Sequence, residues 1–305
     1  MRALKARSLS ARFFVMFFQL LVRIGHRPRQ WLGKILGSLA PRIAPRRSRI
    51  VEQNLALCFP ELSPEARKTL VHAHWRALVQ TFVDRAVLWF GSRQDILDLV
   101  SLEGFEHILN VRARGQRIML LAPHLIGLDA AATRLSLEGY AGATLYAPQS
   151  NPDMDAIVRL GRGRFEHIHL VSRKDGVRGL IRMIRQDLPI YYLPDMDLGA
   201  RGAVFVPFFG VPAATQTATA QLARQFKMVV IPTLAYRDPQ TGRYQVKILP
   251  PLEDFPGEGA TPEEDAACLN QHLQDWIEEA PEQYYWVHRR FKTRPPNEPP
   301  LYTNV

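Results

Sequence analysis

Cysteine is scarce in this 305-residue sequence, which has only Cys58 and Cys268. Two isolated thiols supply neither a disulfide framework nor the ligand set of a zinc site. They fit a reducing compartment such as a bacterial cytoplasm. We expect both to be buried apolar side chains.

A glycine-rich phosphate loop is also lacking. The nearest candidate, Gly161-Arg162-Gly163-Arg164, has no third glycine and does not follow a clear strand. Internal repeats and low-complexity blocks are absent as well. Apolar residues make up 47% and charged residues 22% of the chain, which is ordinary for a folded protein and argues against disorder. The length allows one sizeable α/β domain or two small ones.

Acidic residues are missing from the first 50 positions, which hold twelve Lys and Arg, and the first acid is Glu52. The other 255 residues hold 27 basic and 29 acidic residues, so the net charge of +10 belongs to this arm. Its partner is expected to be an anionic surface, lipid or nucleic acid.

The arm contains the uncharged run Phe13–Val22, which is shorter than the roughly 20 residues that span a bilayer. Helical spacing places Lys5, Arg12, Gln19 and Arg23 on one narrow stripe and apolar side chains on the rest. This pattern favours lipid over nucleic acid. Residues 1–40 are therefore predicted to form a basic, amphipathic, membrane-associating helix region. The alternative is an ordinary helix docked on the body.

The next segments are predicted to be helical. Arg42–Arg49 is interpreted as a basic connector, and Ser63 as the N-cap of a helix to about Phe90. A short helix follows at Arg93–Leu99. We divide the chain into residues 1–40, a helical region 41–100, an α/β domain 101–295 and a Pro-rich tail 296–305.

Residues 101–295 alternate short apolar runs with helical stretches. This alternation predicts an α/β fold with a mostly parallel or mixed central sheet flanked by helices. The expected strands are Ile118–Ala122, Ala143–Ala147, Ile168–Val171, Ile190–Leu193, Val204–Phe208, Val229–Ala235 and Tyr244–Leu249. The expected helices are Leu125–Glu138, Val177–Gln186, Thr215–Phe226 and Pro262–Glu279.

His124 follows an expected strand and Pro123, and Asp129 comes five residues later. If His124 lies in the turn and Asp129 in the first turns of the helix, the carboxylate can fold back onto the imidazole. The other ring nitrogen is then able to take a proton from a substrate hydroxyl. The spacing alone is a weak signal, because chance gives about one such match in a chain of this composition. The strand end adds weight, since open α/β sheets place their sites there.

Basic and acidic side chains follow downstream. Clustered arginines such as Arg162, Arg164 and Arg173 are suited to phosphate, although each is also compatible with a solvated surface. Asp195 and Asp197 end another strand. Without a clear third and fourth ligand, we interpret them as hydrogen-bonding groups that position a base or an Arg rather than as metal ligands.

In order along the chain, these blocks resemble the late acyltransferases of lipid A biosynthesis, the lauroyl/myristoyl acyltransferase family, which belong to the lysophospholipid acyltransferase-like superfamily with the His-x4-Asp/Glu motif. The resemblance runs from about residue 10 to 295. The matching segments are Asn54-Leu55, Cys58-Phe59-Pro60, Ser63, Leu121–Asp129, Tyr146-Ala147-Pro148, Asn151-Pro152, Gly161–Arg164, Tyr192–Asp197, Val204–Phe209 and, most specific, Pro281–Pro295.

The resemblance implies an acyltransferase with His124 as general base and Asp129 as its partner. Arg162 and Arg164 are implied to bind a phosphorylated disaccharide, with Asp195 supporting the site. The implied donor is acyl–acyl carrier protein and the acceptor a Kdo-containing lipid A precursor, at the cytoplasmic face of the inner membrane beside anionic lipids. No cofactor and no metal are called for.

Two positions depart from the family pattern and leave the acylated hydroxyl and the chain length open. Asp129 stands where many members carry Glu, and Ala147 where many carry Arg. One alternative function is acylation of another lipid, such as a lysophospholipid or ornithine lipid. A second is a non-catalytic membrane-binding protein. The basic run Arg289, Arg290, Lys292 and Arg294 is expected to dock the acidic carrier protein.

Overall fold

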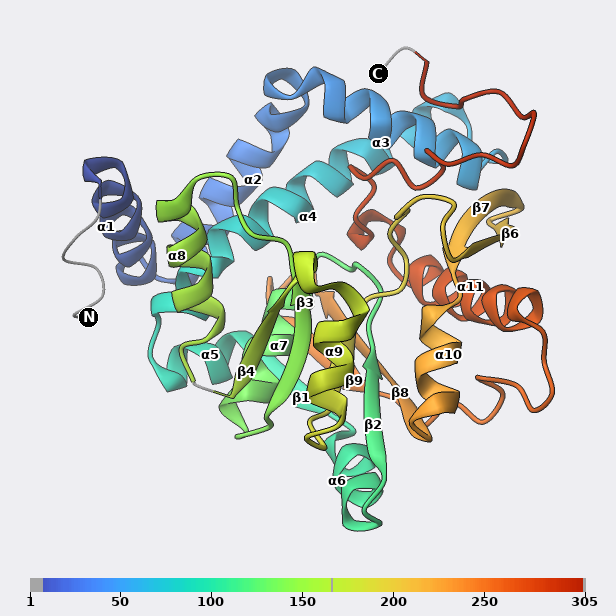
Figure 1. Ribbon diagram of the computed structural model, residues 1–305. Coiled ribbons are helices and arrows are strands. Elements are labelled where there is room, and N and C mark those ends of the chain that lie inside the picture. Colours follow the sequence, from blue (N-terminus) through green and yellow to red (C-terminus); the bar gives the residue numbers. More distant parts are fainter. Residues whose placement is uncertain (1–7, 166, 304–305) are drawn as a thin grey trace.

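The computed structural model describes residues 8–165 and 167–303, so Lys5 of the predicted basic stripe lies outside the described residues. A seven-stranded sheet with the order β1-β9-β8-β2-β5-β3-β4 forms its centre, and β6 and β7 make a separate antiparallel hairpin (Figure 1). The strands are β1 Val100–Glu103, β2 Arg117–Leu121, β3 Gly142–Tyr146, β4 Ile168–Ser172, β5 Ile190–Tyr192, β6 Ala203–Phe208, β7 Val211–Gln216, β8 Met228–Arg237 and β9 Tyr244–Ile248.

The helices surround this sheet. They are α1 Leu9–Arg23, α2 His26–Ile43, α3 Pro45–Cys58, α4 Pro64–Phe90, α5 Arg93–Leu99, α6 Phe105–Ala113, α7 Leu128–Leu137, α8 Pro152–Arg162, α9 Gly176–Ile184, α10 Ala218–Gln225 and α11 Pro262–Glu278. Two short 3-10 turns, η2 Arg173–Asp175 and η3 Pro281–Gln283, complete the described elements.

The sheet is mostly parallel. Strands β8, β2, β5, β3 and β4 pair in parallel, whereas β9 runs antiparallel to β8 and parallel to β1. The predicted α/β fold with a mostly parallel or mixed sheet flanked by helices is therefore confirmed.

Both faces of the sheet are covered, because successive side chains of a strand point to opposite faces. In β2, Met119 and Leu121 join the core under α9, α10 and α11, while Ile118 and Leu120 join the core under α6 and α7. A strand buried on both faces appears as a continuous apolar run in the sequence. This is why the run at residues 118–122 predicted a strand correctly.

The N-terminal part is helical, as predicted, and α4 begins where the sequence indicated. The Ser63 side chain accepts a hydrogen bond from the Ala66 N–H. The prediction that Arg42–Arg49 forms a connector is wrong. Helix α2 continues to Ile43, and α3 starts at Pro45, which a first helical turn accepts because it needs no N–H there.

Several other elements differ from the prediction. Thr215 and Gln216 end strand β7 rather than begin a helix, and α7 starts at Leu128 instead of Leu125. Gly127 sits so close to β8 that a Cβ there would lie 2.5 Å from the Ala235 carbonyl oxygen. Residues 124–127 therefore form a turn. The elements absent from the prediction are β1, α6, β7 and α8.

The two thiols differ in their surroundings. Cys58 is 5% exposed and buried in the core, as predicted. Cys268 is only half-buried, so the expectation of a second core thiol is wrong. Its Sγ contacts Asp254 at the molecular surface.

Helix α1 packs on α4 through Phe18, which is fully buried and contacts Phe82 and Trp89. Its other face carries large apolar side chains into solvent: Leu9, Phe13, Met16, Phe17 and Leu20. Among the described residues, no helix has the combination of length and apolar character that crossing a bilayer requires.

Helix α2 turns its small residues inward and its large ones outward. Gly37 approaches α4 so closely that a Cβ would meet the Arg76 Cα at 2.5 Å, and Gly33 packs on Gln80. The outer face exposes Trp31, Ile35, Leu36, Leu39 and Ile43. A helix that buries glycine and exposes Trp and Ile reverses the usual pattern of a surface helix.

Candidate active site

His124 and Asp195 meet at the carboxyl ends of two neighbouring strands. In the parallel pair β2–β5, Leu121 lies opposite Tyr192. His124 and Asp195 each come three residues after these positions, so the equal offset brings them together. His124 Nδ1 lies 2.6 Å from Asp195 Oδ1, and the His124 backbone N–H donates to Oδ2 at 2.7 Å.

The Asp195 carboxylate is fully buried, and the His124 side chain is 22% exposed. Burial would raise the pKa of Asp195, but the charge and hydrogen bonds of His124 outweigh it and hold this pKa below its usual range. An ionised carboxylate only accepts hydrogen bonds, so Nδ1 of His124 carries a proton and donates it to the hydrogen bond with Asp195. This hydrogen bond fixes the orientation of the imidazole and leaves Nε2 outside the pair.

Asp129 is not the partner of the imidazole, contrary to the prediction. Its Oδ2 accepts a hydrogen bond from Arg85 Nε at 2.8 Å, and its Oδ1 accepts one from Arg162 Nε at 2.9 Å. The turn at residues 124–127 and the start of α7 direct the carboxylate toward α4 and α8. Proximity in sequence misled the prediction, because strand pairing brings the distant Asp195 closer.

Arg85 and Arg162 enclose Asp129 from two helices, α4 and α8. Burial would raise the pKa of Asp129, but the two guanidinium groups lower it below its ordinary value. Arg85 had not been singled out from the sequence. It lies near the C-terminal end of the long helix α4, far from any motif, and no local pattern marks it.

His124 and the Asp129 cluster line one cleft of about 350 Å³, and Asp195 lies buried behind the imidazole. Apolar side chains dominate the rest of its lining, and Tyr285 closes it near the imidazole, with ring centroids 6.3 Å apart. The apolar lining includes Leu145, Ile168, Leu170, Leu193 and Met196. The cleft combines an imidazole, two guanidinium groups and a mostly apolar lining.

Two predicted phosphate ligands lie elsewhere. The Arg164 guanidinium donates to the Leu88 and Gly91 carbonyl oxygens at the end of α4, so it caps that helix. Arg173 is exposed in η2 and does not line the cleft. Of the three predicted arginines, Arg162 is the one that the structure brings to Asp129.

Two of the four basic side chains expected to dock the carrier protein bind backbone carbonyl groups of the protein instead. Arg290 is 1% exposed and donates to the Ala214 carbonyl oxygen, and Arg294 donates to the Pro212 carbonyl oxygen. Both side chains hold the C-terminal segment on the β6–β7 hairpin. At these two positions, the basic side chains stabilise the fold and are not available to dock a partner.

The segment Pro281–Pro295 frames the imidazole. The Tyr285 N–H donates to the His124 carbonyl oxygen at 3.0 Å, and Leu125 pairs with Tyr284 in an antiparallel bridge. Burial lowers the pKa of His288 to about 4, so this ring is neutral and its Nε2 accepts from the Asp197 N–H. The Asp197 carboxylate accepts hydrogen bonds from the backbone N–H and the hydroxyl of Thr293. Asp197 thus fastens the loop after β5 to the C-terminal segment.

Comparison with known proteins finds similar sequences over most of the chain. The model of the bacterial lipid A biosynthesis acyltransferase family matches residues 2–293. The Escherichia coli lipid A biosynthesis lauroyltransferase is 37% identical over 89% of this chain and 87% of its own length. The corresponding palmitoleoyltransferase is 30% identical over 89% and 87% of the two chains, and the myristoyltransferase 31% identical over 86% and 80%. The chain belongs to the bacterial lipid A biosynthesis acyltransferase family.

Proposed function

We propose that this protein transfers a fatty acyl chain from acyl–acyl carrier protein to a hydroxyl of a Kdo-containing lipid A precursor, at the cytoplasmic face of the inner membrane. The observation that carries the proposal is the His124–Asp195 pair at the edge of an apolar cleft that also holds two arginines. The family names of the relatives support the acceptor class.

The chemistry follows from the orientation of the imidazole. His124 Nε2 takes the proton of the acceptor hydroxyl while its oxygen attacks the thioester carbonyl carbon. The tetrahedral intermediate then expels the carrier thiolate, which takes the proton from the imidazolium. An ester bond forms and a thioester bond breaks. Asp195 stabilises the transient imidazolium and holds the ring in place.

The charged cluster supports an anionic acceptor. Arg85 and Arg162 are partly exposed, at 31% and 27% of their side chains, and Asp129 holds both guanidinium planes in position. Preorganised guanidinium groups bind phosphate well, because their N–H donors match its oxygens. In this proposal, Asp129 positions the two arginines for the phosphorylated disaccharide.

The outer faces of α1 and α2 support contact with lipid. Trp31, Ile35 and Leu39 repeat every four residues along α2 and are exposed. Basic side chains accompany them, including the exposed Arg23, Arg27, Lys34 and Arg42. Apolar side chains beside basic ones are typical of helices that lie in the headgroup region of an anionic membrane.

The exposed face of α9 supports docking of the acyl carrier protein that supplies the acyl chain. Arg178 and Arg182 lie one turn apart on this helix, and Arg185 follows its end, all three exposed. A carrier protein is acidic, so this cationic face complements it. The α9 face replaces the C-terminal run as the proposed docking surface.

The assay that tests the function supplies purified full-length protein with acyl–acyl carrier protein and a phosphorylated, Kdo-containing disaccharide precursor, and follows the acceptor by mass spectrometry. A mass gain of one acyl chain on the disaccharide is expected. A gain on a lysophospholipid or ornithine lipid, with none on the disaccharide, would reassign the acceptor. No acyl transfer to any of them would contradict the proposed function.

A further inference from the structure

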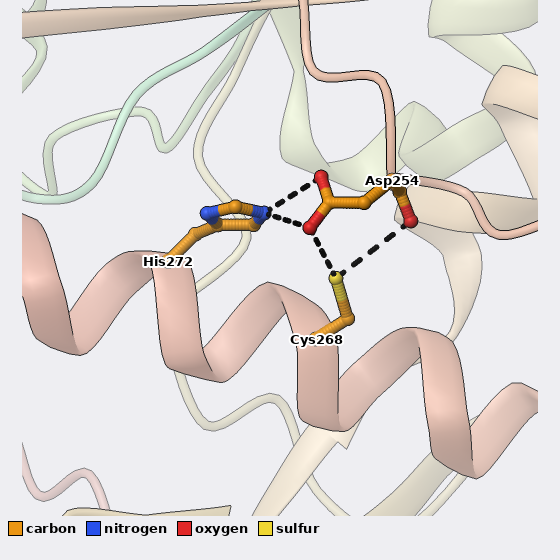
Figure 2. Close-up of side chains that lie close together, drawn as sticks. All are labelled: Asp254, Cys268 and His272. Atoms are coloured by element: carbon orange, nitrogen blue, oxygen red, sulfur yellow. Dashed lines mark hydrogen bonds and ion pairs between the residues drawn. The ribbon is translucent and has the colours of Figure 1, made fainter.

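Three side chains of metal-binding type converge between the loop after β9 and the surface of α11 (Figure 2). Asp254 comes from the loop, and Cys268 and His272 come from the helix. One ligand atom from each lies within 4.8 Å of the other two. Across residues 8–165 and 167–303, no other group of three such side chains meets in this way. None of the three lines the cleft of His124.

The spacing of the ligand atoms suits a tetrahedral ion. His272 Nε2 lies 3.0 Å from each carboxylate oxygen of Asp254, and Cys268 Sγ lies 3.6 Å from Oδ2. With zinc bonds of about 2.0–2.1 Å to N or O and about 2.3 Å to S, tetrahedral ligands are roughly 3.3–3.6 Å apart. The two contacts of Asp254 therefore lie within a few tenths of an ångström of this spacing, and the Cys268 and His272 ligand atoms lie within 4.8 Å of each other.

Neighbouring contacts fix each ligand in place. Cys268 and His272 are four residues apart, so they lie on one face of α11. The His272 ring stacks on Trp276, with centroids 5.6 Å apart. Asp254 precedes Phe255, which is 3% exposed and anchors the loop in the core. The site is therefore preorganised from both elements.

Charge and access also fit a dication. A thiolate and a carboxylate together balance two positive charges, and a neutral imidazole completes the set. The Asp254 side chain is 60% exposed, which leaves one side of the cluster open to water.

We propose that Asp254, Cys268 and His272 form a binding site for a divalent cation of the zinc class, with a fourth position open to solvent. The ion joins the loop after β9 to α11. That helix in turn holds the β6–β7 hairpin, since Asn270 donates to the Pro207 carbonyl oxygen. Its role is to stabilise the scaffold, outside the acyl-transfer chemistry.

The test uses full-length protein stripped with a chelator and titrated with Co²⁺, whose thiolate bond gives a charge-transfer band in the near ultraviolet and whose tetrahedral geometry gives intense visible bands. Both sets of bands are expected to saturate at one equivalent and to disappear when Zn²⁺ displaces Co²⁺. The melting temperature is expected to rise with Zn²⁺ concentration, because an ion that binds the folded state alone stabilises it.

Single variants locate the site. Cys268→Ser is expected to remove the charge-transfer band. Each of the variants Cys268→Ser, His272→Ala and Asp254→Asn is expected to weaken Co²⁺ binding about 10-fold or more. Mutating a residue that only hydrogen-bonds to a metal ligand already lowers metal affinity by about 10–100-fold. Cys58→Ala, which removes the other thiol, is expected to keep the full spectrum. The proposal is overturned if no thiolate band forms, if Cys58→Ala removes it, or if the three ligand variants bind Co²⁺ as tightly as the unmodified chain. In any of those cases, the three side chains serve as a hydrogen-bonded cluster only.

Discussion

The Asp195 carboxylate accepts two hydrogen bonds from His124, one from the ring at 2.6 Å and one from the backbone N–H at 2.7 Å. The first fixes the orientation of the ring, and the second fixes the turn that carries it. A single buried side chain therefore sets both the orientation and the position of the proposed base.

Loss of the base should reduce turnover strongly. We expect His124→Ala to lower kcat by about 10²–10⁴-fold, because a general base contributes about that factor. Asp195→Asn should lower kcat as well, and the double variant should be little worse than either alone, because the two residues act as a unit. The measurement is rate per folded molecule, with folding checked by circular dichroism. Near-normal turnover of folded His124→Ala would reduce His124 to a structural residue.

The Asp129 cluster should act on the acceptor. We expect Arg162→Ala to raise KM for the phosphorylated acceptor more than KM for the acyl donor. Asp129→Ala should lose most activity, because the two arginines lose the carboxylate that orients them, whereas Asp129→Glu should keep part of it. Initial rates with each substrate varied in turn separate these effects. Equal changes in both KM values would rule out a role specific to the acceptor.

Buried neutral histidine should make stability depend on pH. Burial lowers the pKa of His74 to about 4, and its Nδ1 donates to the Glu282 carbonyl oxygen. The unfolded chain has the ordinary value of about 6.5 and binds the proton first, so stability should be lost as the pH falls from about 6.5 to 4. His74→Gln should remove about 3 kcal/mol of this pH dependence. Urea unfolding at pH 7.5 and pH 4.5 measures it, and identical pH dependence in both chains would contradict the assignment.

The outer face of α2 should govern lipid binding. We expect Trp31→Glu, Ile35→Glu and Leu39→Glu, combined, to shift the protein from sedimenting anionic vesicles to the supernatant. The matched control is Leu109→Glu on α6, which changes a similarly exposed apolar residue and should bind as the unmodified chain does. Unchanged sedimentation of the triple variant would assign lipid contact elsewhere.

The basic face of α9 should recruit the donor. Reversing the charges of Arg178, Arg182 and Arg185 to Glu should raise KM for acyl–acyl carrier protein and flatten the dependence of the rate on salt, because screening acts on exposed charges. Arg112 and Arg114, also exposed, provide the control pair at the end of α6. A rate that is independent of ionic strength below donor saturation would exclude electrostatic docking.

The sequence indicated where the strands end, but not which strands lie next to each other in the sheet. The apolar runs before His124 and Asp195 predicted both strands, yet nothing local states that β2 and β5 lie side by side. Strand order comes from the packing of the whole sheet. For the same reason, Asp129 looked like the natural partner of His124 until the fold supplied Asp195.

Surface roles were harder to assign than core roles. Arg164 was predicted to bind phosphate and Arg290 to dock the carrier protein because both are basic, but both side chains donate to backbone carbonyl groups of distant elements. Cys268 looked like a core residue because free thiols usually are. The spacing to His272, one helical turn on, was the signal available in the sequence, and it gains meaning only with Asp254 beside it.

The glycine face of α2 has a consequence for how far the acceptor travels. Gly37 rests on Arg76 of α4, and nine residues later the same rigid helix presents Arg85 to Asp129. Nine helical residues correspond to a rise of about 14 Å, so the point where α2 rests on α4 lies about 14 Å along α4 from the residue that carries one guanidinium group of the cleft. In the proposed function, an acceptor held at the outer face of α2 has to extend its sugars past the thickness of α2 and along α4 to meet Arg85. The rise of α4 sets the second part of that distance.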